Sequence, residues 1–139
     1  MRVFVTGAAG FIGSGVVPDL IAAGHTVTGL ARSDANVETL KRMGADVLHG
    51  SLEDIDSLKR GVTEADGVIH LAFIHDFAKF AENAQIDKRT IEAMGETLAG
   101  TNKPLVVTSG VGLLTPGRLS TEEDAAREGA ALPRVSEHA

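Results

Sequence analysis

The stretch TGAAGFIG, residues 6–13, decides how this chain folds. Its three glycines, spaced three residues apart, join a short apolar run at residues 2–6 to the start of a helical pattern. In such a loop the first glycine permits a sharp turn, the second lets a diphosphate approach the backbone, and the third lets helix and strand pack closely. The free amides and positive dipole of the following helix favour an anion. The pattern predicts a phosphate-binding loop, and a purely packing role for the glycines is the alternative.

Short runs rich in β-branched residues alternate with longer helical patterns along the rest of the chain. We predict strands over residues 2–6, 25–31, 45–49, 67–72 and 105–108. We predict helices over residues 11–23, 34–43 and 55–62, then a loop at 73–80 and a long helix that ends near residue 98. Strands that alternate with helices form right-handed βαβ units. The predicted fold class is therefore α/β, a Rossmann-type doubly wound parallel sheet of about five strands with helices on both faces.

Local signals mark the starts of the predicted helices. Ser33 or Asp34 can cap the second helix. Ser51 and Asp54 stand three residues apart before the third helix and resemble a capping box with Asp in place of Glu. Pro18 removes one backbone donor inside the first helix, so we expect a local kink there. The apolar face of the long helix is predicted to consist of Ala84, Ile91, Met94 and Leu98.

Composition limits the classes of protein to which this chain can belong. Of 139 residues, 43% are hydrophobic and 23% charged, a balance typical of a globular domain. A formal net charge of −6 gives no reason to expect a nucleic-acid or anionic-membrane partner. The chain has no cysteine, and no spacing places three ligands on one element, so no metal site is predicted. Since the chain shows neither a membrane-spanning stretch nor room for a signal peptide before the first strand, we expect a cytoplasmic protein.

Three motifs in a fixed order carry a resemblance to a known family. TGAAGFIG at residues 6–13 is followed by VIHLA at 68–72 on the fourth predicted strand and by VVTSG at 106–110 on the fifth. The chain resembles the short-chain dehydrogenase/reductase superfamily, particularly its extended and atypical members related to NAD-dependent epimerases and dehydratases. The resemblance covers essentially the whole chain. It implies a fold that binds NAD(H) or NADP(H), a small-molecule substrate, and hydride chemistry at C4 of the nicotinamide.

The end of the second predicted strand bears on the choice of dinucleotide. An acid there would hydrogen-bond the adenosine ribose and favour NAD. This chain has Ala31 at that position, followed by Arg32 and Ser33, a guanidinium and a hydroxyl that suit a 2′-phosphate. We therefore expect NADP to be preferred, with NAD as the alternative and with Arg32 as a solvated loop charge in that case. Many relatives have an Asp near the adenine after the third strand, where this chain has Ser51 and Leu52.

The expected cofactor-binding residues follow from these motifs. They are the loop and helix start, the end of the second strand, the segment after the third strand and the end of the fourth strand. By number they are Gly7, Gly10, Phe11, Ile12, Gly13, Arg32, Ser33, Ser51, Leu52, Leu71 and Ala72.

Catalysis is harder to assign from this sequence. In the family a Ser after the fifth strand polarises the substrate oxygen, and Ser109 matches it; a plain strand-closing role is the alternative. The family's proton donor is a Tyr with a Lys four residues later, but the chain contains no Tyr and offers Arg134 and His138 at that spacing. Arg cannot exchange a proton near neutrality, whereas His138 can. His75, followed by Asp76 in the loop after the fourth strand, is the other acid/base candidate, and solvated side chains are the alternative for both histidines.

The chain is short for the family it resembles. We expect one NAD(P)-binding Rossmann domain over residues 1–139 that is an N-terminal fragment of a longer protein, with residues 120–139 as a partly ordered tail; a truncated module is the alternative. In such a fragment, the helix that would follow the fifth strand is cut off, which leaves one face of the sheet less covered. We therefore expect a homo-oligomer that associates through this face. Two functions stay open: the cofactor-binding part of an oxidoreductase or epimerase, and a non-catalytic NAD(P)-binding sensor or regulatory module. An interaction domain that has lost nucleotide binding is disfavoured by the intact glycine loop.

Overall fold

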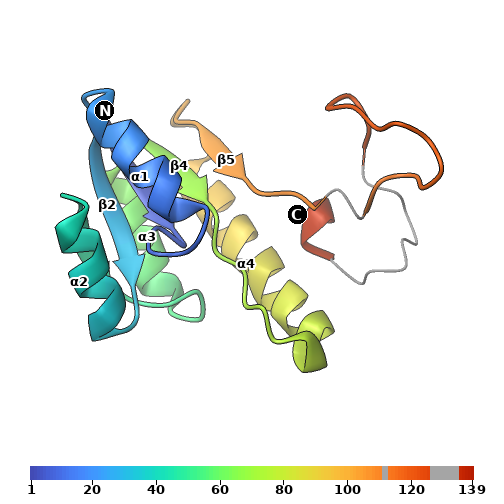
Figure 1. Cartoon of the computed structure of the whole chain (residues 1–139), viewed down its shortest axis with the longest axis horizontal. Helices are drawn as coiled ribbons and strands as arrows, with labels where there is room; N and C mark the ends of the chain where they lie inside the picture. Colours follow the sequence, from blue (N-terminus) through green and yellow to red (C-terminus); the bar gives the residue numbers. More distant parts are fainter. Residues whose placement is uncertain (111–112, 126–134) are drawn as a thin grey trace.

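A computed structural model describes residues 1–110, 113–125 and 135–139 (Figure 1). The described chain forms one five-stranded parallel sheet in the order β3-β2-β1-β4-β5. The strands are β1 (Arg2–Thr6), β2 (Thr26–Ala31), β3 (Asp46–His49), β4 (Gly67–His70) and β5 (Leu105–Val107). The helices are α1 (Gly13–Ala22), α2 (Asp34–Arg42), α3 (Ile55–Glu64) and α4 (Phe80–Leu98), with short 3-10 turns η1 (Phe77–Lys79) and η3 (Val135–His138).

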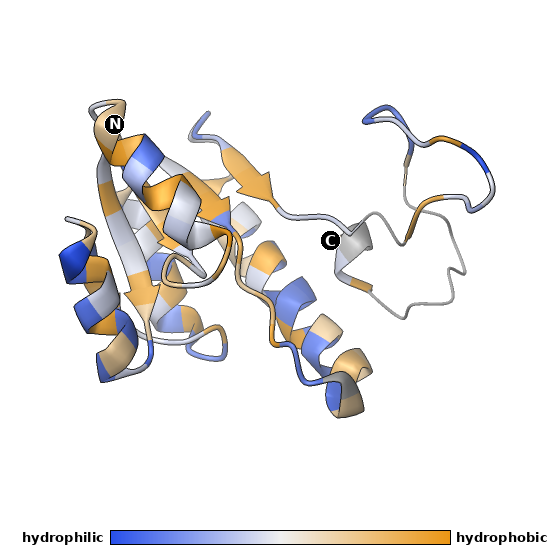
Figure 2. Ribbon diagram, viewed as in Figure 1, coloured by the Kyte–Doolittle hydropathy of each residue, from blue (hydrophilic) through white to orange (hydrophobic). Residues whose placement is uncertain are grey.

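The core lies in two layers, one on each face of the sheet. Alternate residues of a strand point to opposite faces, and in β1 Val5 packs with the α1 and α2 side chains whereas Phe4 packs with those of α3 and α4. Both side chains are fully buried. Figure 2 shows apolar residues along the strands and both polar and apolar residues on the helices. This arrangement confirms the predicted doubly wound α/β fold.

The predicted second and third strands begin one residue early, and the predicted fourth and fifth strands extend past the observed ends. β4 ends at His70, so Leu71 and Ala72 lie just beyond the sheet rather than within it. The reason is that its partner β1 ends at Thr6, where Gly7 turns the chain away with φ +68°. β5 likewise ends at Val107, one residue early. All five parallel strands therefore finish at one edge, where open α/β sheets bind ligands.

The helix starts confirm one local prediction and correct two others. Ser33 caps α2, because its hydroxyl accepts a hydrogen bond from the Asn36 N–H at 3.3 Å. Ser51 does not cap α3: Asp54 does, accepting from the Ser57 N–H at 3.2 Å. The carboxylate three residues further on is thus the cap itself rather than the second member of a capping box. The first helix starts at Gly13 rather than residue 11 and continues through Pro18.

The sheet edge formed by β5 carries exposed apolar surface. Val106 and Val107 are 54% and 46% exposed, and β5 pairs only with β4 among the strands of the described chain. The expected self-association through such a surface stays a prediction. Over the ranges given above, none of the helices has the length and apolar composition needed to cross a membrane. In the same ranges no three His, Cys, Asp or Glu side chains gather as metal ligands.

Candidate functional site

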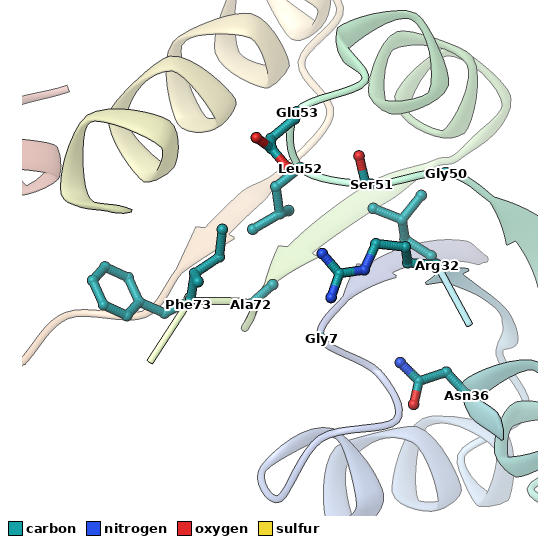
Figure 3. A pocket seen from close by; sticks show the side chains of 11 residues that line it. Gly7, Arg32, Asn36, Gly50, Ser51, Leu52, Glu53, Ala72 and Phe73 are labelled. Atoms are coloured by element: carbon teal, nitrogen blue, oxygen red, sulfur yellow. The ribbon is translucent and has the colours of Figure 1, made fainter. Parts of the chain in front are cut away.

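A cleft of about 300 Å³ opens at the carboxyl ends of β1, β2, β3 and β4 (Figure 3). It brings together five of the residues predicted to bind a cofactor, which come from four separate connections between strands and helices. These are Gly7, Arg32, Ser51, Leu52 and Ala72. Six further residues complete its lining: Leu30, Asn36, Gly50, Glu53, Phe73 and Ile74. The cleft therefore lies where parallel α/β sheets hold their ligands.

The glycine loop forms the floor of this cleft by approaching the end of β4 very closely. A Cβ atom on Gly7 would lie 2.7 Å from the Ala72 nitrogen and 2.9 Å from the Leu71 carbonyl carbon. The Leu71 N–H donates to the Thr6 carbonyl at 3.2 Å, and the Ala72 N–H to the Thr6 hydroxyl at 3.4 Å. A Cβ on Gly13 would overlap the Gly7 and Ala8 carbonyl oxygens. Both positions therefore require glycine, because the neighbouring backbone leaves no space for a side chain.

The entrance of α1 offers unused hydrogen-bond donors. The Gly10 N–H donates to the Gly7 carbonyl and the Ser14 N–H to the Gly10 carbonyl, both at 2.9 Å. Between them, the amides of residues 11–13 make no hydrogen bond within the described chain, and no side chain caps the helix. The Phe11 side chain is 98% exposed. Three free amides at the positive end of a helix form a suitable environment for a phosphate.

Arg32 and Asn36 border the cleft from the β2–α2 side. Figure 3 shows the Arg32 guanidinium directed into the cleft. Arg32 forms no ion pair with any other described residue. Ser33 is absent from the lining because its hydroxyl is turned toward the start of α2 as the helix cap. Sequence reasoning missed Asn36, although its position three residues after a capping Ser places it in the first turn of α2, next to Arg32.

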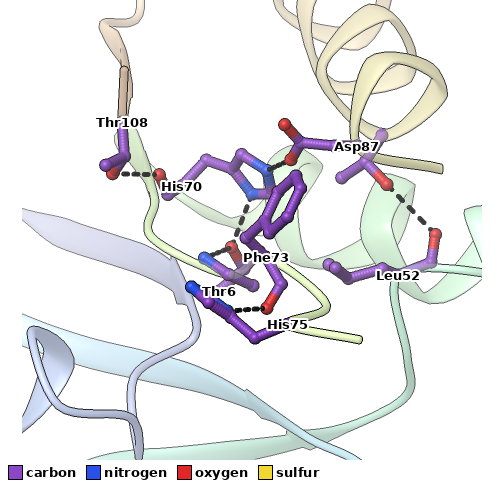
Figure 4. Close-up of polar contacts among 9 residues, drawn as sticks. Thr6, Leu52, His70, Phe73, His75, Asp87 and Thr108 are labelled. Carbon is purple, nitrogen blue, oxygen red and sulfur yellow. Dashed lines mark hydrogen bonds and ion pairs between the residues drawn. The ribbon is translucent and has the colours of Figure 1, made fainter. Parts of the chain in front are cut away.

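A buried polar chain lies behind the cleft floor (Figure 4). Nδ1 of His70 lies 2.6 Å from the Thr6 hydroxyl, and Nε2 lies 2.8 Å from Oδ1 of Asp87 on α4. Because a carboxylate accepts, the ring carries a hydrogen on Nε2 toward Asp87, and Nδ1 and the Thr6 hydroxyl share the second hydrogen bond. The three residues are at most 2% exposed. Asp87 is a further site residue that was not predicted, although it follows Ala84 by three residues and precedes Ile91 by four, which places it on the apolar face of α4.

The polar residues of the loop after β4 make separate local contacts. His75 is exposed; its Nδ1 lies 2.9 Å from the Phe73 carbonyl and its ring packs edge-on against the Phe73 ring, with centroids 5.4 Å apart. Asp76 accepts from the Ala78 N–H at 3.1 Å and caps η1. The Phe73 and Phe80 rings pack against each other with centroids 5.5 Å apart. His75 and Asp76 therefore serve different local contacts and form no acid/base pair with each other.

The remaining catalytic candidates lie at the edge of the described chain. Ser109 is exposed, just beyond the end of β5. The preceding Thr108 hydroxyl donates to the His70 carbonyl at 3.0 Å, which ties this segment to β4. Arg134 and the side chain of His138 lie outside the described residues. The roles of Ser109, His75 and His138 stay predictions.

Comparison with known proteins agrees with the geometry of the cleft. The NAD dependent epimerase/dehydratase family matches residues 3–110. An uncharacterized protein of Schizosaccharomyces pombe, C2A9.02, is 53% identical over 123 residues, which are 88% of this chain and 42% of that protein. Dihydroflavonol 4-reductase of Hordeum vulgare is 35% identical over 79% of this chain and 35% of its own length. The chain thus spans less than half the length of these relatives.

A solved structure with lower sequence identity shows the same fold. The UDP-glucose 4-epimerase of Thermus thermophilus in complex with NAD superposes with a TM-score of 0.71 at 26% identity. The match covers 99% of this chain and 49% of the epimerase chain. A family match over residues 3–110, a doubly wound sheet and a cleft floored by the glycine loop lead to one conclusion: this chain belongs to the NAD dependent epimerase/dehydratase family.

Proposed function

We propose that this chain binds a dinucleotide, with NADP(H) preferred, as the cofactor-binding part of a short-chain dehydrogenase/reductase-like oxidoreductase or sugar-nucleotide epimerase/dehydratase-like enzyme. The observation that carries the proposal is the uncapped start of α1, which follows directly on the glycine loop at the cleft floor. Its three free amides can take the diphosphate. The Gly7 approach to Ala72 also leaves no room for a side chain on the floor. The substrate in this proposal is a small molecule with a carbonyl or alcohol group.

Each part of the cleft has a role in this proposal. The amides of residues 11–13 bind the diphosphate. Ser51 and Leu52 border the adenine, and Leu71 and Ala72 lie near the nicotinamide ribose. Ser109 hydrogen-bonds the reacting oxygen, and His75 is the proposed acid/base group on the loop after β4. When bound, the nicotinamide supplies or accepts a hydride at C4.

NADP preference rests on the β2–α2 side of the cleft. A 2′-phosphate adds negative charge beside Arg32, whose guanidinium has no carboxylate partner in the described part of the chain. Arg32 can give a bidentate hydrogen bond to a phosphate. The Asn36 amide lies on the same side of the cleft and offers a further donor. We therefore place the 2′-phosphate between Arg32 and Asn36, with the Ser33 hydroxyl, which already caps α2, as a secondary contact.

Titration calorimetry with NADPH and NADH tests this proposal. The wild-type chain should bind NADPH more tightly. Arg32→Ala should raise the Kd for NADPH by about tenfold or more, the size expected for losing hydrogen bonds to a charged group, and should change the Kd for NADH much less. Arg60→Ala, which removes the same charge from an exposed position on α3 outside the cleft, is the matched control. Equal losses for both nucleotides in Arg32→Ala would contradict the assignment.

A non-catalytic NADP(H)-binding sensor or regulatory module is the second candidate, because the chain contains no Tyr to donate the proton in the family's usual way. Nicotinamide absorbance, followed while NADPH is mixed with a panel of small carbonyl substrates, separates the two functions. Hydride transfer that Ser109→Ala abolishes would support the enzyme.

A further inference from the structure

Helix α4 crosses behind the cleft and directs two buried polar side chains at its walls. Asp87 and Thr90 are 1% and 0% exposed and lie three residues apart, so they share one face of the helix. Figure 4 shows the Asp87 side chain reaching away from α4 toward His70, and the Thr90 hydroxyl is bonded to the Leu52 carbonyl. Buried polar groups need partners, and the partners of these two side chains belong to the strands and loops that shape the cleft.

The first connection reaches the floor. Oδ1 of Asp87 accepts from His70, whose other ring nitrogen contacts the Thr6 hydroxyl, and that hydroxyl accepts from the Ala72 N–H. Ala72 lines the cleft directly beside Gly7. A continuous chain of hydrogen bonds thus joins α4 to the point where the glycine loop meets the end of β4.

The second connection reaches the wall formed by the β3–α3 segment. The Thr90 hydroxyl donates to the Leu52 carbonyl at 3.1 Å, across 38 positions of sequence. Among the helical threonines of the described chain, Thr90 differs in donating its hydroxyl to another segment rather than to its own helix. The hydroxyls of three other helical threonines donate to the carbonyl four residues earlier in their own helices: Thr39, Thr63 and Thr97. Thr90 instead fixes a backbone group of a cleft-lining loop.

We propose that Asp87 and Thr90 are positioning residues that hold the floor and the Leu52 wall of the cleft at a fixed separation, pre-organised for the dinucleotide. The inference rests on the proposed cofactor role of the cleft. Pre-organisation raises affinity because less ordering is left to occur on binding. A purely structural role for the same hydrogen bonds would alter folding stability without altering the ligand affinity of the folded chain.

The test compares two nearly isosteric substitutions on α4. Thr90→Val removes the hydrogen bond to the Leu52 carbonyl, whereas Thr97→Val removes a hydroxyl bonded only within the helix, to the Ala93 carbonyl at 2.7 Å. Thr90→Val should raise the Kd for NADPH by about fivefold, and Thr97→Val should leave it unchanged. Thr90→Ser keeps the hydroxyl and should restore the affinity. Hydrogen exchange without ligand should show faster amide exchange over residues 50–54 in Thr90→Val alone.

A second pair of variants tests the floor. Asp87→Asn retains an oxygen that can accept from His70 and should keep the wild-type Kd, whereas Asp87→Ala should raise it and speed amide exchange at Ala72. Equal Kd values for Thr90→Val and Thr97→Val, in a wild-type chain that binds NADPH, would overturn this inference alone. Failure of the wild-type chain to bind either dinucleotide would overturn the proposed function, and this inference with it.

Discussion

Replacing Gly7 by Ala tests the closest backbone contact in the cleft. Gly7 has φ +68°, in the left-handed region that costs an L-residue about 1–2 kcal/mol. The added Cβ would lie 2.7 Å from the Ala72 nitrogen and 2.9 Å from the Leu71 carbonyl carbon, both backbone atoms that cannot rotate away. Overpacking of this kind costs about 1–3 kcal/mol. Gly7→Ala should therefore lower the free energy of unfolding by about 2–5 kcal/mol, the sum of the two effects.

Gly15→Ala is the matched control, because the same atoms are added within the following helix with the opposite expected sign. Gly15 lies within α1, and a Cβ there would have no heavy atom within 4 Å. Ala in place of a helical Gly stabilises by about 0.5–1 kcal/mol. Urea unfolding followed by circular dichroism measures both free energies. An unfolding free energy of Gly7→Ala equal to that of the wild type, or equal destabilisation by both substitutions, would refute this reasoning.

Three further predictions concern the helix caps, the core and an exposed turn. Asp54→Ala removes the α3 cap and should lower the unfolding free energy by about 0.5–2 kcal/mol in the same urea assay; a wild-type value would contradict the cap assignment. Met94→Ala opens a cavity in the fully buried layer under α4 and should cost about 2–5 kcal/mol in urea unfolding; a loss as small as that of an exposed site would argue against that packing. The Thr121 backbone N–H and then the Arg118 guanidinium lower the pKa of the Asp124 carboxyl below its ordinary value of 3.8. Because the folded pKa is the lower one, this contact is complete above pH 3.8 and is lost as the pH falls through the folded pKa, so the Thr121 amide NMR signal should titrate with a midpoint below 3.8; a midpoint above it would reverse the sign.

The sheet was predictable because its signals are local. Each strand is a short β-branched run, and the glycine loop at residues 6–13 sets the first crossover. The ends of elements were less predictable, because they depend on partners. β4 stops at His70 only because β1 stops at Thr6, and the carboxylate of Asp54 satisfies the start of α3 in place of Ser51.

Site residues that belong to a family motif could be predicted from the sequence. Site residues whose role depends on contacts between distant segments could not. Arg32 and Ala72 were identified from their places at strand ends, and the structure sets both in one cleft. Thr90 and Leu52 are far apart in sequence, so no periodicity links them. Asp87 carries a readable signal, a carboxylate on an apolar helix face, but its partner His70 is known only once β4 and α4 are packed together.

The most direct test of the central claim is an NMR titration of the 15N-labelled chain with NADPH. We predict saturable shifts of the amide signals of Phe11, Ile12 and Gly13, whose N–H groups make no hydrogen bond within the described chain, together with shifts at Arg32 and Ala72. Saturable binding that leaves these amide signals unmoved, or no saturable shift at any NADPH concentration, would contradict it.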